Sequence, residues 1–199
     1  MTGDAHGLKR TSREYLKQAL LDLMREKSTK KVTVAELCRR AGLNRSTFYD
    51  NYETIERLQD ELMWDYAKPL VAAVTKHGRD PLNLLHKGTA YDCYVEWFTY
   101  VHDNREAFRL LLGKNGMPEF HGILIGQGVD WYEGLIRASG RAEEAGIDPR
   151  VLATYIVGAH CQLLIAYLDD DSHTPVYMAR QVVRLTFDGY LTMLGIHAE

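Results

Sequence analysis

Cysteine, proline and serine are all scarce in this sequence, and each shortage narrows what the chain can be. The three cysteines, Cys38, Cys93 and Cys161, are odd in number, far apart and never arranged as CxxC. That pattern argues against a disulfide framework and a structural zinc site, and it fits a reducing cytosol. Proline occurs five times, and no stretch alternates cleanly between apolar and polar residues over the length of a strand. We therefore expect an all-α protein.

Catalytic signatures are also missing. The sequence contains no GxSxG, HExxH or P-loop pattern and only five serines. Asp92 and Glu96 lie four residues apart and would suit a general acid–base pair, yet a solvated helix face accounts for them equally well. His102, His121 and His160 lack a second ligand at metal spacing, so we expect polar core or pocket residues. An α-helical enzyme stays open as an alternative, but we expect no catalytic residues, no metal and no cofactor.

Two segments bear on contact with a membrane. The N-terminal residues lack the apolar core of a signal peptide. Residues 151–168 carry no charge over a length close to the lower limit for crossing a bilayer. Polar residues interrupt this run, and three aspartates follow it directly. A helix buried in a core or between subunits is the preferred interpretation, and we expect a cytoplasmic protein without a membrane partner.

The charges are unevenly distributed along the 199 residues. Residues 1–57 hold twelve Lys and Arg against eight Asp and Glu, whereas residues 58–199 hold twelve against nineteen. A basic head on an acidic body suggests that the head meets a polyanion. A solvated surface is the alternative explanation, so the asymmetry needs a motif to support it.

Local signals divide the chain into about nine helices. Thr33 and Glu36 form a capping-box pattern, Gly42 fits a left-handed helix end, and Asn44 fits an N-cap. Thr54 fits another N-cap, and three Asp-Pro or Thr-Pro pairs, at 80–81, 148–149 and 174–175, place proline at the first helical position. The expected helices are 12–27, 34–41, 45–51, one beginning after Thr54, 81–103, 104–112, 118–140, 149–169 and 175–195.

The helices 34–41 and 45–51 have the spacing of a helix-turn-helix motif. The tight turn requires Gly42, while Leu37, Cys38 and Phe48 are spaced to fill a shared core. The second helix then presents its other face to the major groove of DNA, where Arg, Ser, Thr and Asn pair with bases or phosphates. The residues that we expect to contact DNA are Lys30, Lys31, Thr33, Arg45, Ser46, Thr47, Tyr49, Asn51 and Tyr52.

The run KKVTVAELCRRAGLNRSTFYDNYETIERLQDEL resembles the N-terminal domain of the TetR family of bacterial transcriptional regulators. The matching parts are the TVAEL opening, the AGL turn, the STFY core of the second helix and the aromatic Tyr52, over roughly residues 10–60. The resemblance implies a helix-turn-helix DNA-binding domain over 1–56 and a helical effector-binding and dimerisation domain over 57–199. The sequence departs from the family where Glu53, Thr54 and Ile55 stand in place of a lysine-rich run, which removes two expected phosphate contacts.

Beyond the helix-turn-helix motif, residues 91–102 form an aromatic-rich segment with two apolar stripes at helical spacing. Its two apolar stripes are explained by core packing, or by a ligand cavity between helices. The family resemblance implies such a cavity for a small-molecule effector. The residues that we expect to line it are Tyr94, Trp97, Phe98, Val101, His102, Phe120, Trp131 and Tyr132.

The last two long helices are the expected dimer interface. Residues 151–168 are too apolar for a helix with one wet face, and 175–195 carries a continuous apolar stripe. Packing against two-fold mates would give a four-helix interface, although both helices would also serve to close the core of one subunit. The interface residues that we expect are Tyr155, Ala159, Leu163, Val183, Phe187 and Tyr190.

These observations predict a homodimeric, sequence-specific DNA-binding regulator. The resemblance implies a repressor that a small-molecule ligand releases from double-stranded operator DNA. The acidic Glu53 keeps one alternative open, a co-regulator of the same fold that acts mainly through a protein partner with weak or no DNA binding.

Overall fold

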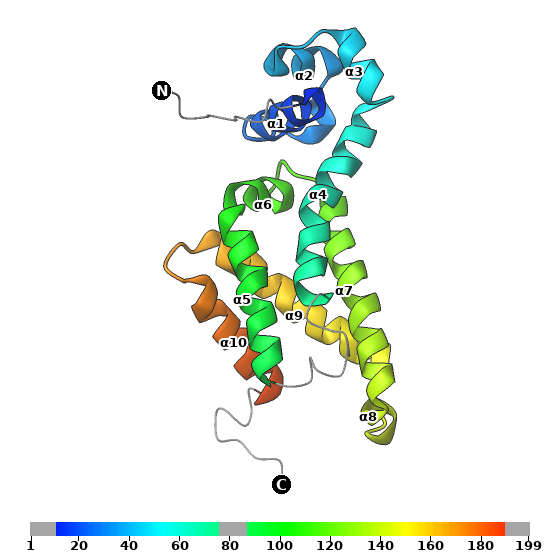
Figure 1. Ribbon diagram of the computed structural model, residues 1–199, viewed down its shortest axis with the longest axis vertical. Coiled ribbons are helices and arrows are strands. Elements are labelled where there is room, and N and C mark those ends of the chain that lie inside the picture. The colour runs from blue at the N-terminus through cyan, green and yellow to red at the C-terminus, as the bar shows by residue number, and fades with distance from the viewer. Residues whose placement is uncertain (1–10, 76–86, 190–199) are drawn as a thin grey trace, which may run out of the picture.

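The computed structural model describes residues 11–75 and 87–189, and all regular structure in these ranges is helical (Figure 1). The all-α prediction is therefore confirmed. The helices are α1 (Ser12–Met24), the short 3₁₀ helix η1 (Thr29–Lys31), α2 (Val34–Ala41), α3 (Arg45–Asn51), α4 (Ile55–Thr75), α5 (Lys87–Asp103), α6 (Arg105–Leu112), α7 (Pro118–Ser139), α8 (Arg141–Glu144), α9 (Pro149–Asp169) and α10 (Pro175–Phe187).

The predicted helices agree with these bounds, with a few differences. The first helix ends at Met24 rather than at residue 27, and the short helices η1 and α8 were not predicted. The last helix ends at Phe187 rather than at residue 195, because the following Asp188 and Gly189 are not helical, and Gly189 has φ of 68°. The expected start at Pro81 lies outside the described residues. The expected domain boundary between residues 56 and 57 falls inside α4, so one continuous helix crosses it.

Local hydrogen bonds fix the helix ends of the first sixty residues. Thr33 accepts from the Glu36 amide and Glu36 reaches back to the Thr33 amide, which confirms the capping box. Gly42 has φ of 68°, a left-handed conformation that costs a side-chain-bearing residue about 1 kcal/mol or more. Asn44 accepts from the Thr47 amide and so begins α3. Thr11 caps α1 in the same manner through Glu14.

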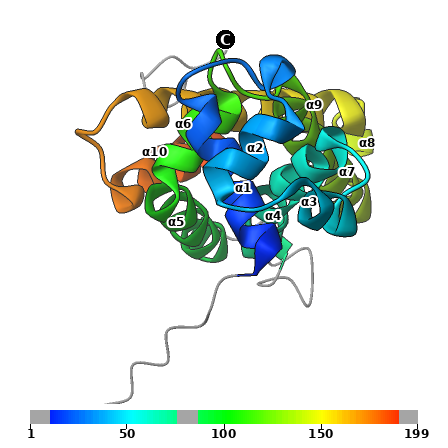
Figure 2. The ribbon, with the colours of Figure 1, turned by 90° about the horizontal axis from the view of Figure 1, so that it is seen from above.

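The helices form a small head on a larger body. In Figure 1 the head of α1, α2 and α3 lies at one end, and α4 runs from the head into the body formed by α5, α7, α9 and α10. Seen from above, α6 lies beside α1 (Figure 2). Leu16, Leu20 and Phe48 are fully buried in the head, and the burial of each such side chain stabilises the fold by roughly 1.5–3 kcal/mol.

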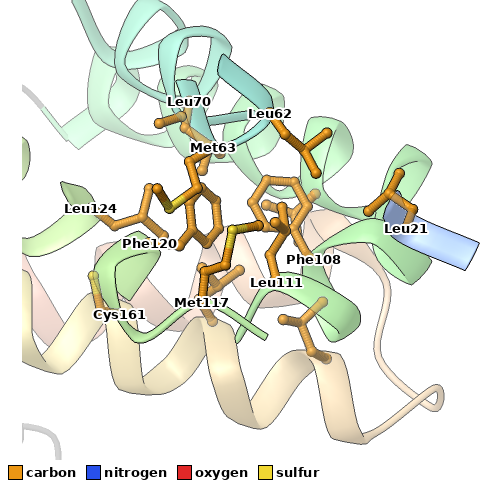
Figure 3. Packing of buried hydrophobic residues seen from close by; sticks show 14 of the residues in the cluster. Leu21, Leu62, Met63, Leu70, Phe108, Leu111, Met117, Phe120, Leu124 and Cys161 are labelled. Carbon is orange, nitrogen blue, oxygen red and sulfur yellow. The ribbon is translucent and has the colours of Figure 1, made fainter. Parts of the chain in front are cut away.

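The core continues from the head into the body. Figure 3 shows Leu62, Met63 and Leu70 of α4 above Phe108 and Leu111 of α6, with Met117, Phe120 and Leu124 completing the cluster. One contiguous apolar core therefore spans head and body, joined through α4 and α6, while Cys93 and Leu135 form a smaller separate cluster.

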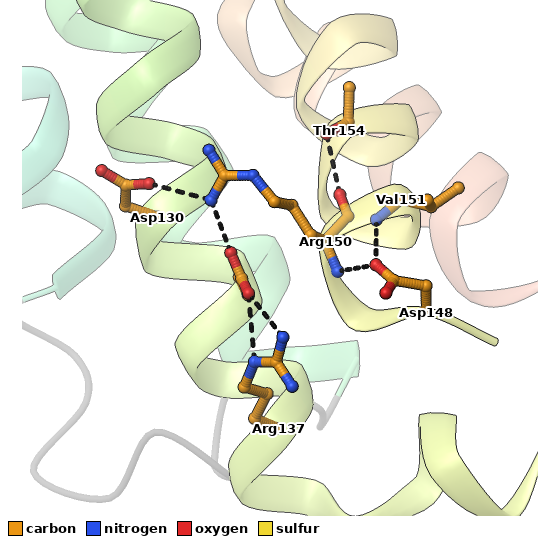
Figure 4. A network of polar contacts seen from close by, with 7 residues as sticks. Asp130, Arg137, Asp148, Arg150, Val151 and Thr154 are labelled. Carbon is orange, nitrogen blue, oxygen red and sulfur yellow. Dashed lines mark hydrogen bonds and ion pairs between the residues drawn. The ribbon is translucent and has the colours of Figure 1, made fainter.

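Close packing and an ion-pair network join α7 to α9. A Cβ atom at Gly128 of α7 would lie 2.8 Å from Val157 Cγ1 of α9, so only glycine allows the two helices to approach this closely. At the other end, Arg150 of α9 pairs with Asp130 at 3.5 Å and with Glu133 at 2.7 Å, and Glu133 also pairs with Arg137 (Figure 4). Arg137, Arg150 and Asp130 are exposed, so each pair contributes little even though Glu133 is half-buried. The buried contact at Gly128 therefore sets the helix spacing.

Candidate functional sites

The outer face of α3 carries the residues expected to read DNA. Arg45, Ser46 and Tyr49 are exposed, and Tyr49 is 59% accessible. Phe48 on the opposite face is fully buried, with its ring 5.4 Å from that of Tyr49. The short helix is therefore amphipathic, with one anchoring side chain and a polar outer surface. Within the described residues, Arg45 and Tyr49 form no side-chain hydrogen bond or ion pair, so their polar groups are available to a partner.

Ser46, Thr47 and Asn51 of α3 are already engaged with the helix cap or the helix backbone. Asn44 Oδ1 accepts hydrogen bonds from Ser46 Oγ at 2.7 Å and from Thr47 Oγ1 at 2.8 Å. Asn51 Nδ2 donates to the Thr47 carbonyl at 2.8 Å. To contact DNA, these groups must either form a second hydrogen bond or give up the ones they form within the protein.

Tyr52 corrects the expectation that it faces outward. It is only 4% accessible, and the Arg13 guanidinium carbon lies 4.8 Å from its ring centroid. Burial raises the pKa of its hydroxyl to about 12. The physical reason is that α3 ends at Asn51, and Tyr52 is extended with φ of −142°, so its side chain leaves the helix face and joins the core. A phosphate contact through this hydroxyl is inconsistent with the structure.

The N-terminus of α2, expected to bind a phosphate, already holds the side chain of Glu36. Lys30 and Lys31 are exposed on η1, as expected, and Thr33 is exposed as well. The Thr33 hydroxyl, however, hydrogen-bonds the Glu36 carboxylate at 2.8 Å, and Lys27 pairs with the same carboxylate. The hydrogen bonds from Lys27 and Thr33 lower the pKa of Glu36 to about 2. A carboxylate therefore occupies the helix N-terminus that was expected to attract a phosphate.

One exposed arginine near this surface was missed in the sequence. Arg57 lies in the first turn of α4, its side chain is 70% exposed, and its nearest acid is Asp60 at 4.0 Å. It borders a polar crevice with Arg13, Asn51 and Glu53. Arg13 in turn donates to the Asn51 carbonyl at 3.0 Å and pairs with Glu61 at 2.9 Å. The position of Arg57 one turn after the expected N-cap Thr54 was the sequence signal that could have identified it.

A cavity of about 80 Å³ lies between α4, α5, α7 and α9. It unites four of the expected ligand residues, Tyr94, Trp97, Trp131 and Tyr132. Leu124 and His160, which were expected as a cavity residue and as a polar core or pocket residue, also line it. The lining residues that were not expected are Leu70, Val71, Gln127, Gly128, Val157 and Cys161.

The other expected ligand residues lie elsewhere. Phe98, Val101 and Phe120 are fully buried in the core; Phe98 packs against Tyr167 with ring centroids 5.3 Å apart. His102 is exposed, and its Nδ1 hydrogen-bonds the Tyr167 hydroxyl at 2.9 Å. The reason is that α5 is covered by apolar neighbours on more than one side, so apolar spacing alone did not reveal which stripe borders the cavity.

A chain of hydrogen bonds forms the polar part of the cavity wall. Tyr132 and Tyr94 share a hydrogen bond between their hydroxyls, Tyr94 Oη lies 2.8 Å from His160 Nδ1, and His160 Nε2 lies 3.1 Å from Thr186 Oγ1. Burial lowers the pKa of His160 to about 4 and raises that of Tyr132 to about 12. The chain is therefore uncharged at neutral pH. His160 was identifiable as the one imidazole within the apolar run 151–168.

The expected dimer residues divide between the surface and the core. On α9, Tyr155 is 65% accessible, Ala159 is exposed and Leu163 is half-buried. On α10, Val183 is buried within the single chain, which corrects its assignment to the dimer interface, whereas Phe187 is half-buried and packs against the core. The stripe on α10 packs against α5 inside the chain. Tyr190 lies outside the described residues.

Exposed apolar side chains remain on the same two helices. They are Val151 and Tyr155 on α9 and Val176, Tyr177 and Leu185 on α10. By length and composition, the helix Pro149–Asp169 could cross a membrane, and only 39% of its most apolar window is buried within the chain. A single helix of this kind is weak support for a membrane protein. Its exposed apolar side is the feature that needs a partner.

Comparisons with known proteins agree with this architecture. A TetR C-terminal family model, described as "Transcriptional regulator C-terminal region", matches residues 88–188, whereas a search of curated proteins finds no significant match. Three similar solved structures carry the same fold at low sequence identity, and each is covered almost completely.

The first is PfmR, a TetR family transcriptional regulator from Thermus thermophilus, with 22% identity, TM-score 0.59, and coverage of 96% of this chain and 100% of that one. The transcriptional regulator FadR from Bacillus subtilis, in complex with stearoyl-CoA, has 15% identity, TM-score 0.62 and coverage of 88% and 98%. NalD, the secondary repressor of the MexAB-OprM efflux pump in Pseudomonas aeruginosa, has 18% identity, TM-score 0.62 and coverage of 89% and 96%. Because the family model covers half of the chain and its fold agrees throughout, this protein belongs to the TetR family of transcriptional regulators.

Proposed function

We propose that this regulator is a cytoplasmic homodimeric repressor that binds operator DNA through α3 and releases it when a small molecule enters the cavity. The observation that carries the proposal is the exposed face of α3, on which Arg45 and Tyr49 have no polar partner among the described residues while Phe48 anchors the helix. Arg side chains pair with guanine or phosphate, and a Tyr hydroxyl reaches a phosphate from a rigid ring. NalD, which is named as a repressor, has the same fold.

A dimer would bring two such heads to adjacent half-sites. The exposed apolar residues of α9 and α10 support this arrangement, because Val151 and Tyr155 are each 65% accessible in a single chain. Burying them against a two-fold mate removes apolar surface from water. Two helix-turn-helix heads then bind half-sites about 34–36 Å apart, or a multiple of this spacing.

Two elements would connect the cavity to the head. Helix α4 begins beside α3 and lines the cavity with Leu70 and Val71. The turn after α6 hydrogen-bonds the head: Thr29 Oγ1 donates to the Gly116 carbonyl at 3.1 Å, and Asn115 Nδ2 donates to the Met24 carbonyl at 3.2 Å. A ligand that prefers one position of α4 or α6 would change the separation of the two heads, and so the operator affinity.

Helix α6 is in turn fixed to the end of α9. Arg105 donates to the Tyr167 carbonyl and, at 2.7 Å, to the Asp170 carbonyl, and Arg109 donates to the Leu168 carbonyl at 2.6 Å. These arginines satisfy carbonyls that a helix C-terminus leaves unpaired, and their charge suits the negative end of the helix dipole. Hydrogen bonds thus join the head to the turn after α6, and α6 to the end of the proposed dimer helix.

The test begins with duplex DNA selected by this protein from a random pool. Arg45→Ala and Tyr49→Ala should each weaken binding by roughly five- to 150-fold with unchanged circular dichroism, because each removes about 1–3 kcal/mol of contact. Arg141→Ala is the matched control, since Arg141 is exposed on α8 in the body. Unchanged binding by both head variants would refute the placement of α3 on DNA.

Salt dependence separates this proposal from the co-regulator alternative, which the exposed Glu53 favours. A DNA reader should lose affinity with a log–log slope of about −0.9 for each phosphate neutralised. No selectable sequence and no steep slope at low salt would favour a protein that acts through a protein partner.

A further inference from the structure

The wall of the cavity between α4, α5, α7 and α9 selects among ligands by charge. None of its twelve described lining residues is Lys, Arg, Asp or Glu. An ion that entered would lose its hydration without gaining a counter-charge, at a cost of several kcal/mol. His160 offers no compensation, because burial keeps its imidazole neutral at physiological pH.

The same wall is rich in aromatic rings. Tyr94, Trp97, Trp131 and Tyr132 all line it, and they already contact one another edge to face: the Tyr94 and Trp97 ring centroids are 6.4 Å apart, and those of Trp131 and Tyr132 are 4.9 Å apart. An aromatic ligand would continue this pattern, and each such ring pair adds about 0.5–1.5 kcal/mol beyond area burial.

Resting on the proposed function, we propose that the effector is an uncharged single-ring aromatic compound with one hydroxyl or carbonyl group, of which a simple phenol is the model case. Its ring lies beside Trp97 and Trp131, and its polar group hydrogen-bonds the chain Tyr132–Tyr94–His160.

The hydrogen-bond chain suits either polarity of that group. With His160 Nδ1 as acceptor, Tyr132 donates to Tyr94, Tyr94 donates to His160, and Nε2–H donates to Thr186. The Tyr132 oxygen then has lone pairs left to accept from a ligand hydroxyl. With every donor reversed, the Tyr132 O–H is released and can donate to a ligand carbonyl. Because all members are neutral, the reversal moves no net charge.

The size of the cavity limits the ligand to about one ring. Its volume is about 80 Å³, whereas an engineered apolar cavity of about 150 Å³ holds benzene. A single ring therefore needs the cavity to widen by movement of the half-buried Trp97 and Trp131, and a larger ligand would need still more space. A second cavity, of about 270 Å³, lies beyond Tyr94 and Tyr132 and is lined by Cys93, Leu135 and Phe187. The two cavities share Tyr94, Trp131 and Tyr132 in their walls.

Aromatic walls also bind quaternary ammonium ions through cation–π contacts. The converging hydroxyl and imidazole groups argue against that class, because a quaternary ammonium has no N–H or oxygen with which to hydrogen-bond them. The described lining also lacks a carboxylate to balance the positive charge.

Four matched probes test the inference by isothermal titration calorimetry: para-cresol, toluene, para-toluate and para-tolyltrimethylammonium. We expect para-cresol to bind, toluene to bind roughly three- to tenfold more weakly, and the two ions not to bind at millimolar concentration. Tighter binding of either ion than of para-cresol would overturn the inference, and so would the absence of binding by all four.

Variants locate the site. Tyr132→Phe should reduce para-cresol affinity to that of toluene and leave toluene unchanged, whereas Tyr91→Phe, a half-buried tyrosine of α5 outside the lining, should change neither. Trp131→Ala should weaken both probes, with Trp64→Ala as the matched control outside the cavity. If neither Tyr132→Phe nor Trp131→Ala changes the affinity for para-cresol, the assignment of the site is wrong.

A separate measurement keeps the two proposals distinguishable. Para-cresol is added to the complex with selected DNA and the DNA affinity is measured again. Binding of para-cresol without any change in DNA affinity would contradict the release mechanism while leaving the ligand class supported.

Discussion

His160 is an imidazole held in its neutral form by burial. Its side chain lies in the cavity wall, where both ring nitrogens have partners but the described lining holds no carboxylate to stabilise a positive charge. Desolvation lowers its pKa from the ordinary value of 6.5 to about 4. In the pH range between these values the unfolded chain binds a proton that the folded protein does not.

We therefore expect acid to destabilise the fold through this residue. Since the unfolded state carries more protons, stability falls as the pH is lowered from about 6.5 and the loss is complete below about 4, for a total of about 3 kcal/mol. Urea unfolding at a series of pH values should show this slope. His160→Gln, which keeps hydrogen-bonding capacity but does not titrate, should flatten it; an unchanged slope would show that His160 is not the group responsible.

Single residues also show where sequence reasoning succeeds and fails. Gly42, Asn44 and the Thr33–Glu36 pair were predictable because their roles depend on neighbours within a few positions of the chain. The inward direction of Tyr52 was not predictable. Tyr52 lies one residue beyond the end of α3, and its extended backbone turns its side chain into the core. The carboxylate of the α2 cap was visible in the sequence, but its pairing with Lys27 depends on a tertiary contact.

At the scale of elements, α7 contains glycines with opposite roles. Gly128 sits where α7 crosses α9, and an added Cβ would lie 2.8 Å from the buried Val157. Gly122 has nothing within 4 Å of such an atom among the residues described. The first glycine is required by packing, whereas the second only lowers helix propensity.

Alanine at these two positions should therefore have effects of opposite sign. Gly128→Ala should destabilise the protein by about 1–2 kcal/mol, because overpacking of a rigid valine exceeds the gain in helix propensity. Gly122→Ala should stabilise it by roughly 0.5–1 kcal/mol. Chemical denaturation of both variants provides the comparison, and stabilisation by Gly128→Ala would mean that α7 and α9 are able to separate at little cost.

The turn after α6 is the second element with a testable role. Thr29 is buried and donates to the Gly116 carbonyl, so it fixes the head to the body. Thr29→Val keeps the shape and removes the donor, which leaves a buried carbonyl unsatisfied at a cost of about 1–2 kcal/mol. We expect amide hydrogen exchange in α1 and α2 to accelerate more than in α9.

The matched control is Thr99→Val on α5, because the exposed Thr99 donates within its own helix, to the Val95 carbonyl at 2.7 Å. This variant should leave exchange in the head unchanged. Equal acceleration in head and body by Thr29→Val would show that the hydrogen bond stabilises the whole fold rather than the junction.

Helix existence was predictable for most of the chain because proline, glycine and capping residues mark its ends. Which neighbour each helix packs against was harder to predict. On α10 the apolar stripe through Val183 and Phe187 packs against α5 within one chain, although its spacing suits a dimer interface equally well. Periodicity identifies an apolar face but does not identify the element that covers it.

At the scale of the whole molecule, the uneven charge and the exposed apolar residues lie on different helices. The first 57 residues carry the excess of Lys and Arg, while Val151, Tyr155, Val176, Tyr177 and Leu185 expose apolar surface on α9 and α10 of the body. A dimer formed through the body would leave both heads free to bind the same face of a DNA duplex.

This arrangement makes the proposed dimer separable from the fold. Tyr155→Asp places a charge on the exposed face of α9, where the side chain is 65% accessible and has no role in the core of one chain. We expect sedimentation velocity to show monomer in place of dimer at micromolar concentration, with circular dichroism unchanged, and DNA affinity to fall as one half-site contact is lost. Tyr49→Asp, at a tyrosine 59% accessible on the head, should abolish DNA binding yet sediment as a dimer. If Tyr155→Asp also remains dimeric, the subunits meet on another surface, and the exposed apolar face of α9 and α10 requires a different partner.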